Sequence, residues 1–385
     1  MSLHFILKDY CVDYNGEIVY LLRKEYYLLK YLFENANQPF TRSHLLDEVW
    51  KLETPSDRTI DDHIYRLRKK LKDWDNLISI DTVKGFGYQL SKKEIRVETA
   101  PVAYDKEFHI LIEKLFNKYN LYGSGEAINA LVNQKALNIN MPVDYNPLIY
   151  FMKGDFWWFV QDYKHQMSSK LLFLIYLFSV ISKDYRQTIV YIKNGLEKKL
   201  FPDHVIYEVE NITLLYAYVF SREFALAKEQ MTKIEKNSPE ITEQSNDLYP
   251  SYLIISLIKA MCLRENKKVQ DIIVKLDMFF SEKPYQRELG IYTVIKGLFG
   301  IQSGREKDGR ADIEKGFETI KKTKYKSHIF TAIDICMFLL AEDVKDDLTH
   351  QDIYEKWKSL NKEYQFTTLI KSIKIILEEQ VGGES

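Results

Sequence analysis

The clearest hydrophobic period in the chain lies in residues 57–72. Apolar side chains recur there at i, i+4, i+7 and i+11, at Ile60, Ile64, Leu67 and Leu71. This spacing predicts an amphipathic helix over residues 58–71 that buries one stripe of side chains. The residues that follow predict a short connection and a two-stranded ribbon that turns at Lys84-Gly85-Phe86-Gly87.

The opposite face of this predicted helix is polar and mostly basic. Its members are Arg58, Asp62, Tyr65, Arg66, Lys69 and Lys70. Side chains of these types suit DNA phosphates and base edges, and a helix built this way fits the major groove. Acids at the start of a helix and bases at its end also offset the helix dipole on any surface helix. Both interpretations can hold at once.

Residues 3–90 resemble the winged-helix effector domain of OmpR/PhoB-type bacterial transcription factors. The segment RTIDDHIYRLRKKL at 58–71 is similar to that family's recognition helix, and TVKGFGYQL at 82–90 is similar to its C-terminal hairpin. The resemblance implies short strands at 3–7 and 18–21, a first helix that opens at 23–29 and a second helix at 41–50. It therefore implies an α+β winged helix-turn-helix fold that binds double-stranded DNA.

The same resemblance assigns roles to single side chains. Arg66 matches the base-contacting arginine of the family, whose guanidinium suits guanine O6 and N7. Asp62 matches a base-facing position that a small or apolar residue usually holds, so its carboxylate either accepts from a cytosine amino group or repels phosphate. Thr82 and Lys84 match hairpin positions, and Lys84 stands where an arginine often enters the minor groove. Trp50, Arg58, Thr59, His63, Arg68 and Tyr88 match phosphate-contacting positions, and Lys69 joins them as a base on the polar helix face.

The segment KLETPSD, at 51–57, connects the second helix to the recognition helix. It is slightly shorter than in well-known members of the family. In that family this loop contacts RNA polymerase, and the resemblance extends the expectation of a polymerase contact to this chain.

A polar stretch that ends at Pro101 separates this domain from the rest of the chain. We expect a winged-helix domain at 1–92, a linker at 93–102, a helical domain at 103–380 and a flexible tail at 381–385. Predicted helices lie at 104–119, 124–138, 147–164, 167–182, 184–199, 204–220, 222–236, 247–264, 267–281, 285–303, 307–322, 326–341, 350–362 and 365–379. Short polar turns between them predict antiparallel neighbours.

A degenerate repeat with an offset of 45 residues runs through the second domain, and its apolar spacing resembles a tetratricopeptide (TPR) unit. We therefore predict an all-α, TPR-like helical repeat domain, with an irregular helical bundle as the alternative. A stacked repeat leaves a concave groove. Asn211, Tyr218 and Tyr252 are candidates to hold a peptide backbone there, or else they simply pack or face water.

Six aromatic residues cluster between positions 151 and 163: Phe151, Phe156, Trp157, Trp158, Phe159 and Tyr163. They form either a hydrophobic pocket or dimer surface, or a core between adjacent helices. The core is the favoured interpretation, because both periods of a helix pair are filled.

The composition narrows the choice of function. Lysine and arginine number 54 against 55 aspartate and glutamate residues, a balance that does not suggest a nonspecific nucleic-acid coat. Cys11, Cys262 and Cys336 form neither a disulfide framework nor a metal-spaced pair, which suits a reducing cytoplasm. The apolar run at 171–181 is shorter than the ~20 residues that span a bilayer. Scattered histidines and the lack of a nucleophile motif predict no metal, no cofactor and no enzyme activity.

Met1 leads directly into the winged helix, without the receiver domain that usually precedes it. This order resembles one-component bacterial regulators, in which the second domain dimerises or senses an effector. The leading interpretation is a cytoplasmic, homodimeric, sequence-specific transcription regulator whose helical domain responds to a peptide or protein. The alternative is an interaction scaffold whose winged helix serves protein contacts. The exposure of Arg66, Lys69, Lys70 and Lys84 distinguishes the two interpretations.

Overall fold

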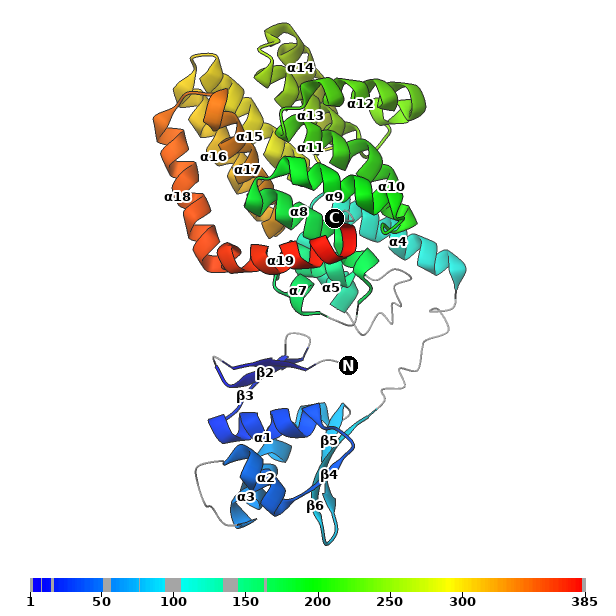
Figure 1. The fold of residues 1–385 in the computed structure, drawn as a ribbon, viewed down its shortest axis with the longest axis vertical. Helices are drawn as coiled ribbons and strands as arrows, with labels where there is room; N and C mark the ends of the chain where they lie inside the picture. The colour runs from blue at the N-terminus through cyan, green and yellow to red at the C-terminus, as the bar shows by residue number, and fades with distance from the viewer. Residues whose placement is uncertain are drawn as a thin grey trace. The chain divides into compact units, whose positions relative to one another are not determined.

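The computed structural model describes residues 3–7, 9–14, 17–50, 57–75, 77–93, 105–133, 145–162 and 165–382. The chain divides into two compact units, residues 1–101 and 102–385 (Figure 1). This division falls inside the segment 93–102 that was expected to link two domains. Of the expected tail, Val381 still belongs to the last helix, and residues 383–385 lie outside the described residues.

The first unit begins with a three-stranded antiparallel sheet in the order β1-β2-β3. Its strands are β1 His4–Ile6, β2 Cys11–Tyr14 and β3 Glu17–Tyr20. Strands β1 and β3 occupy most of the segments predicted at 3–7 and 18–21. The central strand β2 was not predicted, because four residues give too short a period and its order comes from pairing on both sides.

Three helices follow: α1 Arg23–Glu34, α2 Arg42–Val49 and α3 Asp57–Lys70. All four residues of the predicted stripe, three on α3 and Leu71 just after it, are at least 95% buried, so the period in the sequence marks the core face of this helix. Helix α1 begins with half of a capping box: the Glu25 carboxylate accepts from the backbone N–H of Leu22 at 2.8 Å, whereas the Leu22 side chain has no acceptor to complete it. Helix α2 is capped by Thr41, whose hydroxyl accepts from the backbone N–H of His44.

A second antiparallel sheet, in the order β4-β6-β5, forms the wing of the unit. Its strands are β4 Pro39–Thr41, β5 Ile78–Val83 and β6 Gly87–Lys92, and β5 and β6 are the two strands of the predicted ribbon. Gly85 turns the ribbon with a φ of +76°, which favours glycine. Gly87 lets β4 approach, because a Cβ at this position would stand 2.0 Å from the carbonyl oxygen of Phe40. Strand β4 was not predicted.

The second unit contains only helices among its described residues. The α-helices are α4 Lys106–Leu121, α5 Gly125–Asn133, α6 Asn146–Lys153, α7 Trp158–Gln161, α8 Met167–Ser182, α9 Tyr185–Glu197, α10 Asp203–Glu208, α11 Leu214–Phe220, α12 Phe224–Asn237, α13 Tyr249–Cys262, α14 Asn266–Glu282, α15 Gln286–Gln302, α16 Glu306–Lys322, α17 Lys326–Glu342, α18 Asp347–Tyr364 and α19 Phe366–Val381. A π-helical segment, Val209–Thr213, joins α10 to α11, and a 3-10 turn, Pro239–Thr242, follows α12.

The prediction of one helix over 147–164 is wrong. Gly154, with a φ of +79°, ends α6, and α7 starts four residues later. The helix predicted at 204–220 is continuous but carries the π-helical segment in its middle. The end of the helix predicted at 124–138 lies outside the described residues beyond Asn133.

Four turns within successive helix pairs repeat one backbone conformation. Lys183, Arg222, Arg264 and Gly304 all have a φ between +57° and +81°, and each ends the first helix of a pair. They follow one another at intervals of about 40 residues, shorter than the offset predicted from the apolar pattern. The repeating unit is a helix pair, and its TPR-like character remains a prediction.

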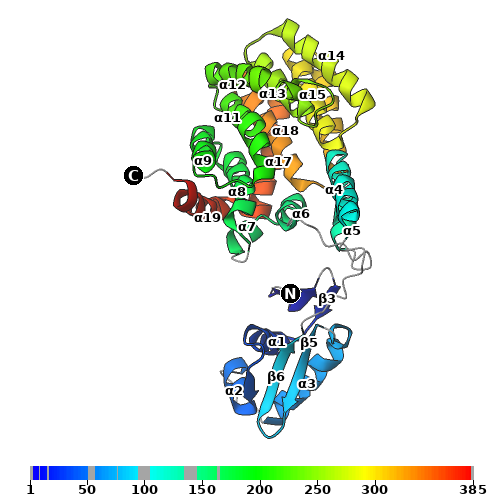
Figure 2. The same ribbon diagram turned by 90° about the vertical axis from the view of Figure 1, so that its right-hand side faces the viewer.

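The helix pairs stack through their first helices, since α11 contacts α13, α13 contacts α15 and α15 contacts α17. The C-terminal helices then return to the start of the stack. Helix α19 packs against α7, α8 and α9, and α17 packs against α6 and α8 (Figure 1 and Figure 2). The stack is therefore closed on one side by its own last helices.

The aromatic cluster near residue 151 belongs to the core of this unit. Phe151, Phe156 and Phe159 are buried, and Trp157 and Trp158 are half-buried against them, whereas Tyr163 lies outside the described residues. The apolar run at 171–181 lies in α8, whose leucines at 171 and 174 are fully buried. In the described part of the chain, no helix is both long and apolar enough to cross a membrane.

Candidate nucleic-acid interface

Helix α3 presents a continuous polar face away from the core of the first unit. Its exposed residues at helical spacing are Arg58, Asp62, Tyr65, Arg66 and Lys69. Tyr65, for example, is 69% exposed. Fourteen residues make a helix of roughly 21 Å, so this face can follow a major groove about 12 Å wide.

Arg68 fastens α3 to the wing. Its Nε donates to the carbonyl oxygen of Ile80 at 2.7 Å, and its Nη2 donates to Thr82 Oγ1 at 3.0 Å. Both acceptors lie on β5. Arg68 remains exposed and can still meet a phosphate, but it also sets the position of the hairpin relative to the helix.

A second contact group joins α2, α3 and β6. Tyr88 donates from its hydroxyl to Asp61 Oδ1 at 2.7 Å, and Arg42 Nε donates to the same oxygen at 2.7 Å. The Arg42 guanidinium also lies 5.0 Å from the centre of the Tyr88 ring. Partial burial raises the pKa of the Asp61 carboxyl, but the hydrogen bonds from Tyr88 and Arg42 outweigh it and hold this pKa below its usual range.

Sequence reasoning missed Arg42 and Asp61. The available signal was the position of Arg42, which is the first residue of α2. A cation is unfavourable at a helix N-terminus because the dipole is positive there. A partner carboxylate was therefore to be expected, and Asp61 supplies it.

Two residues expected to contact phosphate are core residues. Trp50 is only 3% exposed and Tyr88 only 5%, so each acts beneath the surface. Trp50 lies edge-on to the ring of His63, with 5.0 Å between ring centres. The sequence could not reveal this burial, because both side chains carry polar atoms and the residues that cover them come from other elements. His63 and Thr59 are half-buried, and His63 Nδ1 bonds the carbonyl oxygen of Thr59 at 2.8 Å.

Lys70 does not belong to the free basic face. Its Nζ lies 2.7 Å from Oε2 of Glu25, whose side chain is fully buried, and 3.2 Å from the carbonyl oxygen of Tyr20. It therefore compensates a buried carboxylate on α1. Arg66, Lys69 and Lys84 are exposed, and Lys84 lies at the hairpin turn beside Phe86, which is 46% exposed.

The expected ligand residues of the second unit are buried. Asn211, Tyr218 and Tyr252 are between 6% and 7% exposed, and Asn211 Nδ2 donates to the carbonyl oxygen of Tyr207 in its own helix. Stacking on both sides buries nearly the whole circumference of these helices, which leaves no face for a peptide at these positions. In the structure Asn211, Tyr218 and Tyr252 pack inside the unit, which was the alternative to a peptide-binding role.

Nothing in the described residues gathers three side chains that could hold a metal ion. Cys11 and Cys336 are buried and Cys262 is half-buried. Burial, aided by the nearby Asp343 carboxylate, raises the pKa of Cys262 to about 12, so this thiol is not activated as a nucleophile.

Residues 16–90 match the family described as "Transcriptional regulatory protein, C terminal". The same region is similar to named regulators of several bacteria. It is 41% identical over 86 residues to the sensory transduction protein RegX3 of Mycolicibacterium smegmatis, which is 22% of this chain and 38% of that protein. It is 46% identical over 80 residues to the uncharacterized transcriptional regulatory protein YclJ of Bacillus subtilis, or 20% of this chain and 35% of that protein. The chain thus spans little more than a third of the length of these curated relatives.

Two solved structures match 24% and 23% of this chain. The DNA-binding domain of Bacillus subtilis CssR is 32% identical and matches 23% of this chain and 99% of its own, with a TM-score of 0.21. The DNA-binding domain of the response regulator AdeR, in complex with an intercistronic region, is 24% identical with a TM-score of 0.22. With the family match, the helices α1–α3 and the β5–β6 wing, the N-terminal unit is a winged-helix DNA-binding domain of the OmpR/PhoB type, and a large helical region follows it.

Proposed function

We propose that this protein is a sequence-specific DNA-binding regulator of bacterial transcription. The observation that carries the proposal is the exposed face of α3, where Arg58, Arg66 and Lys69 stand at helical spacing with their side chains outward. This is the element that corresponds to the recognition helix, in a domain whose relatives include proteins named as transcriptional regulatory proteins.

Within this proposal, α3 enters the major groove and Arg66 contacts a base edge, because its guanidinium can form two parallel hydrogen bonds to guanine. Arg58 lies about two helical turns from Arg66 and Lys69 about one turn from it, and both neutralise phosphates. Lys84 at the hairpin turn approaches the adjacent minor groove. Arg68 and Thr82 hold the hairpin in place and contact the sugar-phosphate backbone of the DNA. Asp62 lies between Arg58 and Arg66 and favours a base that donates, such as cytosine.

Trp50, Tyr88, Thr59 and His63 have a supporting role in this proposal. Their burial places them under the interface, where they hold α3 and the wing at a fixed separation. Precise positioning matters because a shift of an ångström misaligns paired hydrogen bonds to a base.

We further propose that the helical unit assembles two copies of the chain and responds to an effector. A dimer would place two winged helices on two half-sites, as is usual for helix-turn-helix proteins. Such a regulator acts in the cytoplasm, where bacterial DNA lies. The expected RNA polymerase contact concerns residues 51–57, most of which lie outside the described residues.

The second candidate, a scaffold whose winged helix binds protein, requires its basic residues to be taken up in protein contacts. Lys70 meets this condition through Glu25, but Arg66, Lys69 and Lys84 are exposed. Three of the four residues therefore favour DNA.

Selection of duplexes from a random pool by the full chain, followed by footprinting, tests the proposal. We expect enrichment of one motif and a steep loss of affinity with salt, because phosphate neutralisation releases counterions. Recovery of no motif, with equal weak binding to all duplexes, would contradict sequence-specific regulation.

A further inference from the structure

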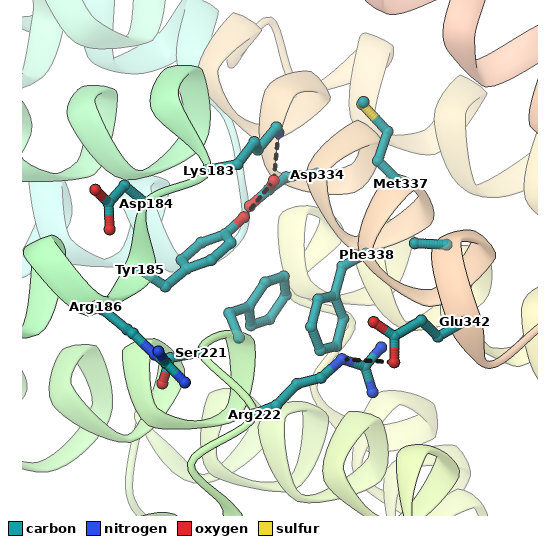
Figure 3. Close-up of a pocket in the computed structure, with 12 residues that line it drawn as sticks. Lys183, Asp184, Tyr185, Arg186, Ser221, Arg222, Asp334, Met337, Phe338 and Glu342 are labelled. Carbon is teal, nitrogen blue, oxygen red and sulfur yellow. Dashed lines mark hydrogen bonds and ion pairs between the residues drawn. The ribbon is translucent and has the colours of Figure 1, made fainter.

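The helical unit contains a pocket of about 500 Å³, a volume in the usual range for small-molecule sites (Figure 3). Three separate segments build it: the turn between α8 and α9 at Lys183, the turn between α11 and α12 at Arg222, and the second half of α17. These segments come from different helix pairs and are brought together only by the return of α17 to the start of the stack.

One side of the pocket is aromatic. The rings of Phe220 and Phe338 stack with 4.5 Å between their centres, and Tyr216 stacks on the other face of Phe220 at 4.0 Å. Phe220 is buried, whereas Phe338 and the adjacent Met337 are half-buried (Figure 3). This wall offers an apolar or aromatic group a preformed surface to pack against.

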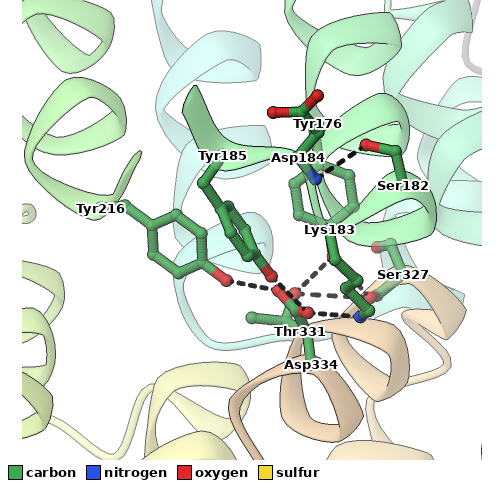
Figure 4. A network of polar contacts seen from close by, with 9 residues as sticks. All are labelled: Tyr176, Ser182, Lys183, Asp184, Tyr185, Tyr216, Ser327, Thr331 and Asp334. Atoms are coloured by element: carbon green, nitrogen blue, oxygen red, sulfur yellow. Dashed lines mark hydrogen bonds and ion pairs between the residues drawn. The ribbon is translucent and has the colours of Figure 1, made fainter. Parts of the chain in front are cut away.

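A buried carboxylate on α17 also lines the pocket and joins several of its segments. Asp334 is 1% exposed and accepts from the hydroxyls of Tyr185 at 2.6 Å and Tyr216 at 2.9 Å, and it pairs with Lys183 (Figure 4). Nearby, Tyr176 donates to the carbonyl oxygen of Ser327 at 3.0 Å. Asp334 is therefore fully used inside the protein and does not oppose an anionic ligand.

Two guanidinium groups at the pocket have weaker partners. The side chain of Arg186 is 77% exposed and pairs at 3.4 Å with Glu223, whose side chain is 40% exposed. Arg222 is firmly held by the buried Asp343 at 2.7 Å, but its Nε has only the 65% exposed Glu342 at 3.4 Å. Exposed ion pairs of this kind contribute about 0–1 kcal/mol, so a carboxylate seated in the pocket can replace them.

We propose that this pocket binds a carboxylate joined to an apolar or aromatic group. The carboxylate would lie between Arg186 and the Nε side of Arg222. The apolar group would pack on Met337 and the edge of the Phe338 ring, because Phe220 stacks on this ring and the Arg222 guanidinium lies 4.7 Å from its centre. Two sources supply this chemistry: a free small organic acid, and the C-terminal residue of a peptide. Such a ligand contacts the α8–α9 turn, the α11–α12 turn and α17 at once. It thereby links helix pairs that are separate in the sequence and meet only in the folded protein.

Any effect of this ligand on DNA binding rests on the proposed regulatory function. The proposed binding site itself does not depend on that function. A ligand that bridges these turns changes DNA affinity only if it prefers one of two arrangements of the helical unit. Binding to the pocket is measured on the protein alone, so failure of the site and failure of the regulatory proposal are separable.

Calorimetry on the full chain tests the site with two matched pairs of probes at millimolar concentration. The first pair is 3-phenylpropanoate and its amide, and the second is N-acetyl-glycyl-phenylalanine with a free or an amidated C-terminus. We expect at least one acid to bind ten-fold or more tightly than its amide. If 3-phenylpropanoate binds more tightly, the natural ligand is a small organic acid. If the dipeptide with a free C-terminus binds more tightly, the natural ligand is the C-terminal residue of a peptide.

Arg186→Gln should weaken binding of the preferred acid at least five-fold, because it removes one guanidinium from an exposed position. Arg264→Gln is the charge-matched control: Arg264 is also an exposed arginine, at the turn of a neighbouring helix pair, and it does not line the pocket. We expect the control to bind as the unchanged protein does. Equal binding of acids and amides, or an equal loss in both variants, would overturn the site. Acid binding that leaves the affinity for selected DNA unchanged would support the site and overturn its regulatory consequence.

Discussion

Tyr88 on β6 donates a hydrogen bond to Asp61 on α3 across 2.7 Å, and this contact joins the wing to the proposed recognition helix. Arg42 from α2 completes the group with bonds to both residues, at 2.7 Å to Asp61 and 3.3 Å to Tyr88. Three elements that are far apart in sequence thus meet at one carboxylate. The geometry of the interface depends on this carboxylate being ionised.

Tyr88→Phe should therefore weaken the contact between the wing and α3 without leaving a cavity in the core. The lost hydrogen bond is expected to cost about 0.5–1.5 kcal/mol of stability, near the lower figure because the Asp61 side chain is 43% exposed. DNA affinity should fall by a similar factor on all sequences, because the variant disturbs positioning rather than base contact. Calorimetric unfolding and titration of several duplexes measure the two effects.

The same variant tests the pH dependence of the winged helix. The pKa of Asp61 lies below its usual range in the folded protein, so its contribution to stability is present above about pH 4 and is lost as pH falls through the folded pKa. In Tyr88→Phe, carboxyl NMR should show the pKa of Asp61 closer to the ordinary value. An unchanged Asp61 pKa would mean that Arg42 alone holds the carboxylate.

Arg66→Ala and Arg68→Ala should weaken DNA binding in different ways. Arg66 has its side chain free on the exposed face, so its loss should cost about 1–3 kcal/mol and relax preference at one base pair per half-site. Arg68 also bonds Ile80 and Thr82, so its loss should weaken all sequences and reduce amide protection in β5. Selection and footprinting with each variant, beside hydrogen exchange, distinguish them.

Arg23→Ala serves as the charge-matched control, because Arg23 is exposed on α1. It should leave the selected motif unchanged. If Arg66→Ala also leaves both affinity and motif unchanged, α3 is not the reading helix.

The first unit was largely predictable because its signals are local. The apolar stripe from Ile60 to Leu71 follows the period of a single helix. The ribbon turns at a single glycine with a positive φ, Gly85. Strands β2 and β4 were missed because three or four residues acquire order only through partners distant in sequence. Burial of Trp50 and Tyr88 was missed for the same reason: the atoms that cover them come from other elements.

The second unit was predictable helix by helix, but its site was not. Apolar periods located most helices to within a few residues, and the repeated turns at Lys183, Arg222 and Arg264 were present in the sequence as a basic residue before an acidic one. No local pattern marks the pocket, because Arg186 and Phe338 meet only after α17 returns to α8. Asn211, Tyr218 and Tyr252 were chosen by residue type, and packing places them inside.

His328→Gln should flatten the pH dependence of the helical unit. Burial and the nearby Arg287 cation lower the pKa of His328 well below its usual range. As pH falls below about 6.5, the unfolded chain takes up this proton before the folded protein does, so stability decreases. Calorimetry between pH 7 and pH 5 should show a smaller decrease in His328→Gln than in the unchanged protein. His204→Gln, at an exposed position on α10, should follow the unchanged protein, and an identical decrease in all three would exclude His328 as the cause.

The close approach of α15 and α16 gives the sharpest packing prediction. A Cβ at Gly297 would stand 2.5 Å from the carbonyl oxygen of Gly309 and 2.9 Å from the backbone nitrogen of Ile313. Backbone atoms cannot move aside as side chains do, so Gly297→Ala should force the helices apart and cost about 1–3 kcal/mol.

Gly300 on the same helix is the matched control for this prediction. Its Cβ would meet Gly309 Cα at an ordinary 3.4 Å, so Gly300→Ala should gain about 0.5–1 kcal/mol through helix propensity. The two substitutions add the same methyl group three residues apart and are expected to move the unfolding temperature of the helical unit in opposite directions. Calorimetry of the full chain measures both shifts. A rise in both variants would show that α15 and α16 are not in backbone contact, and a fall in both would show that the helix pair tolerates no methyl group along this face.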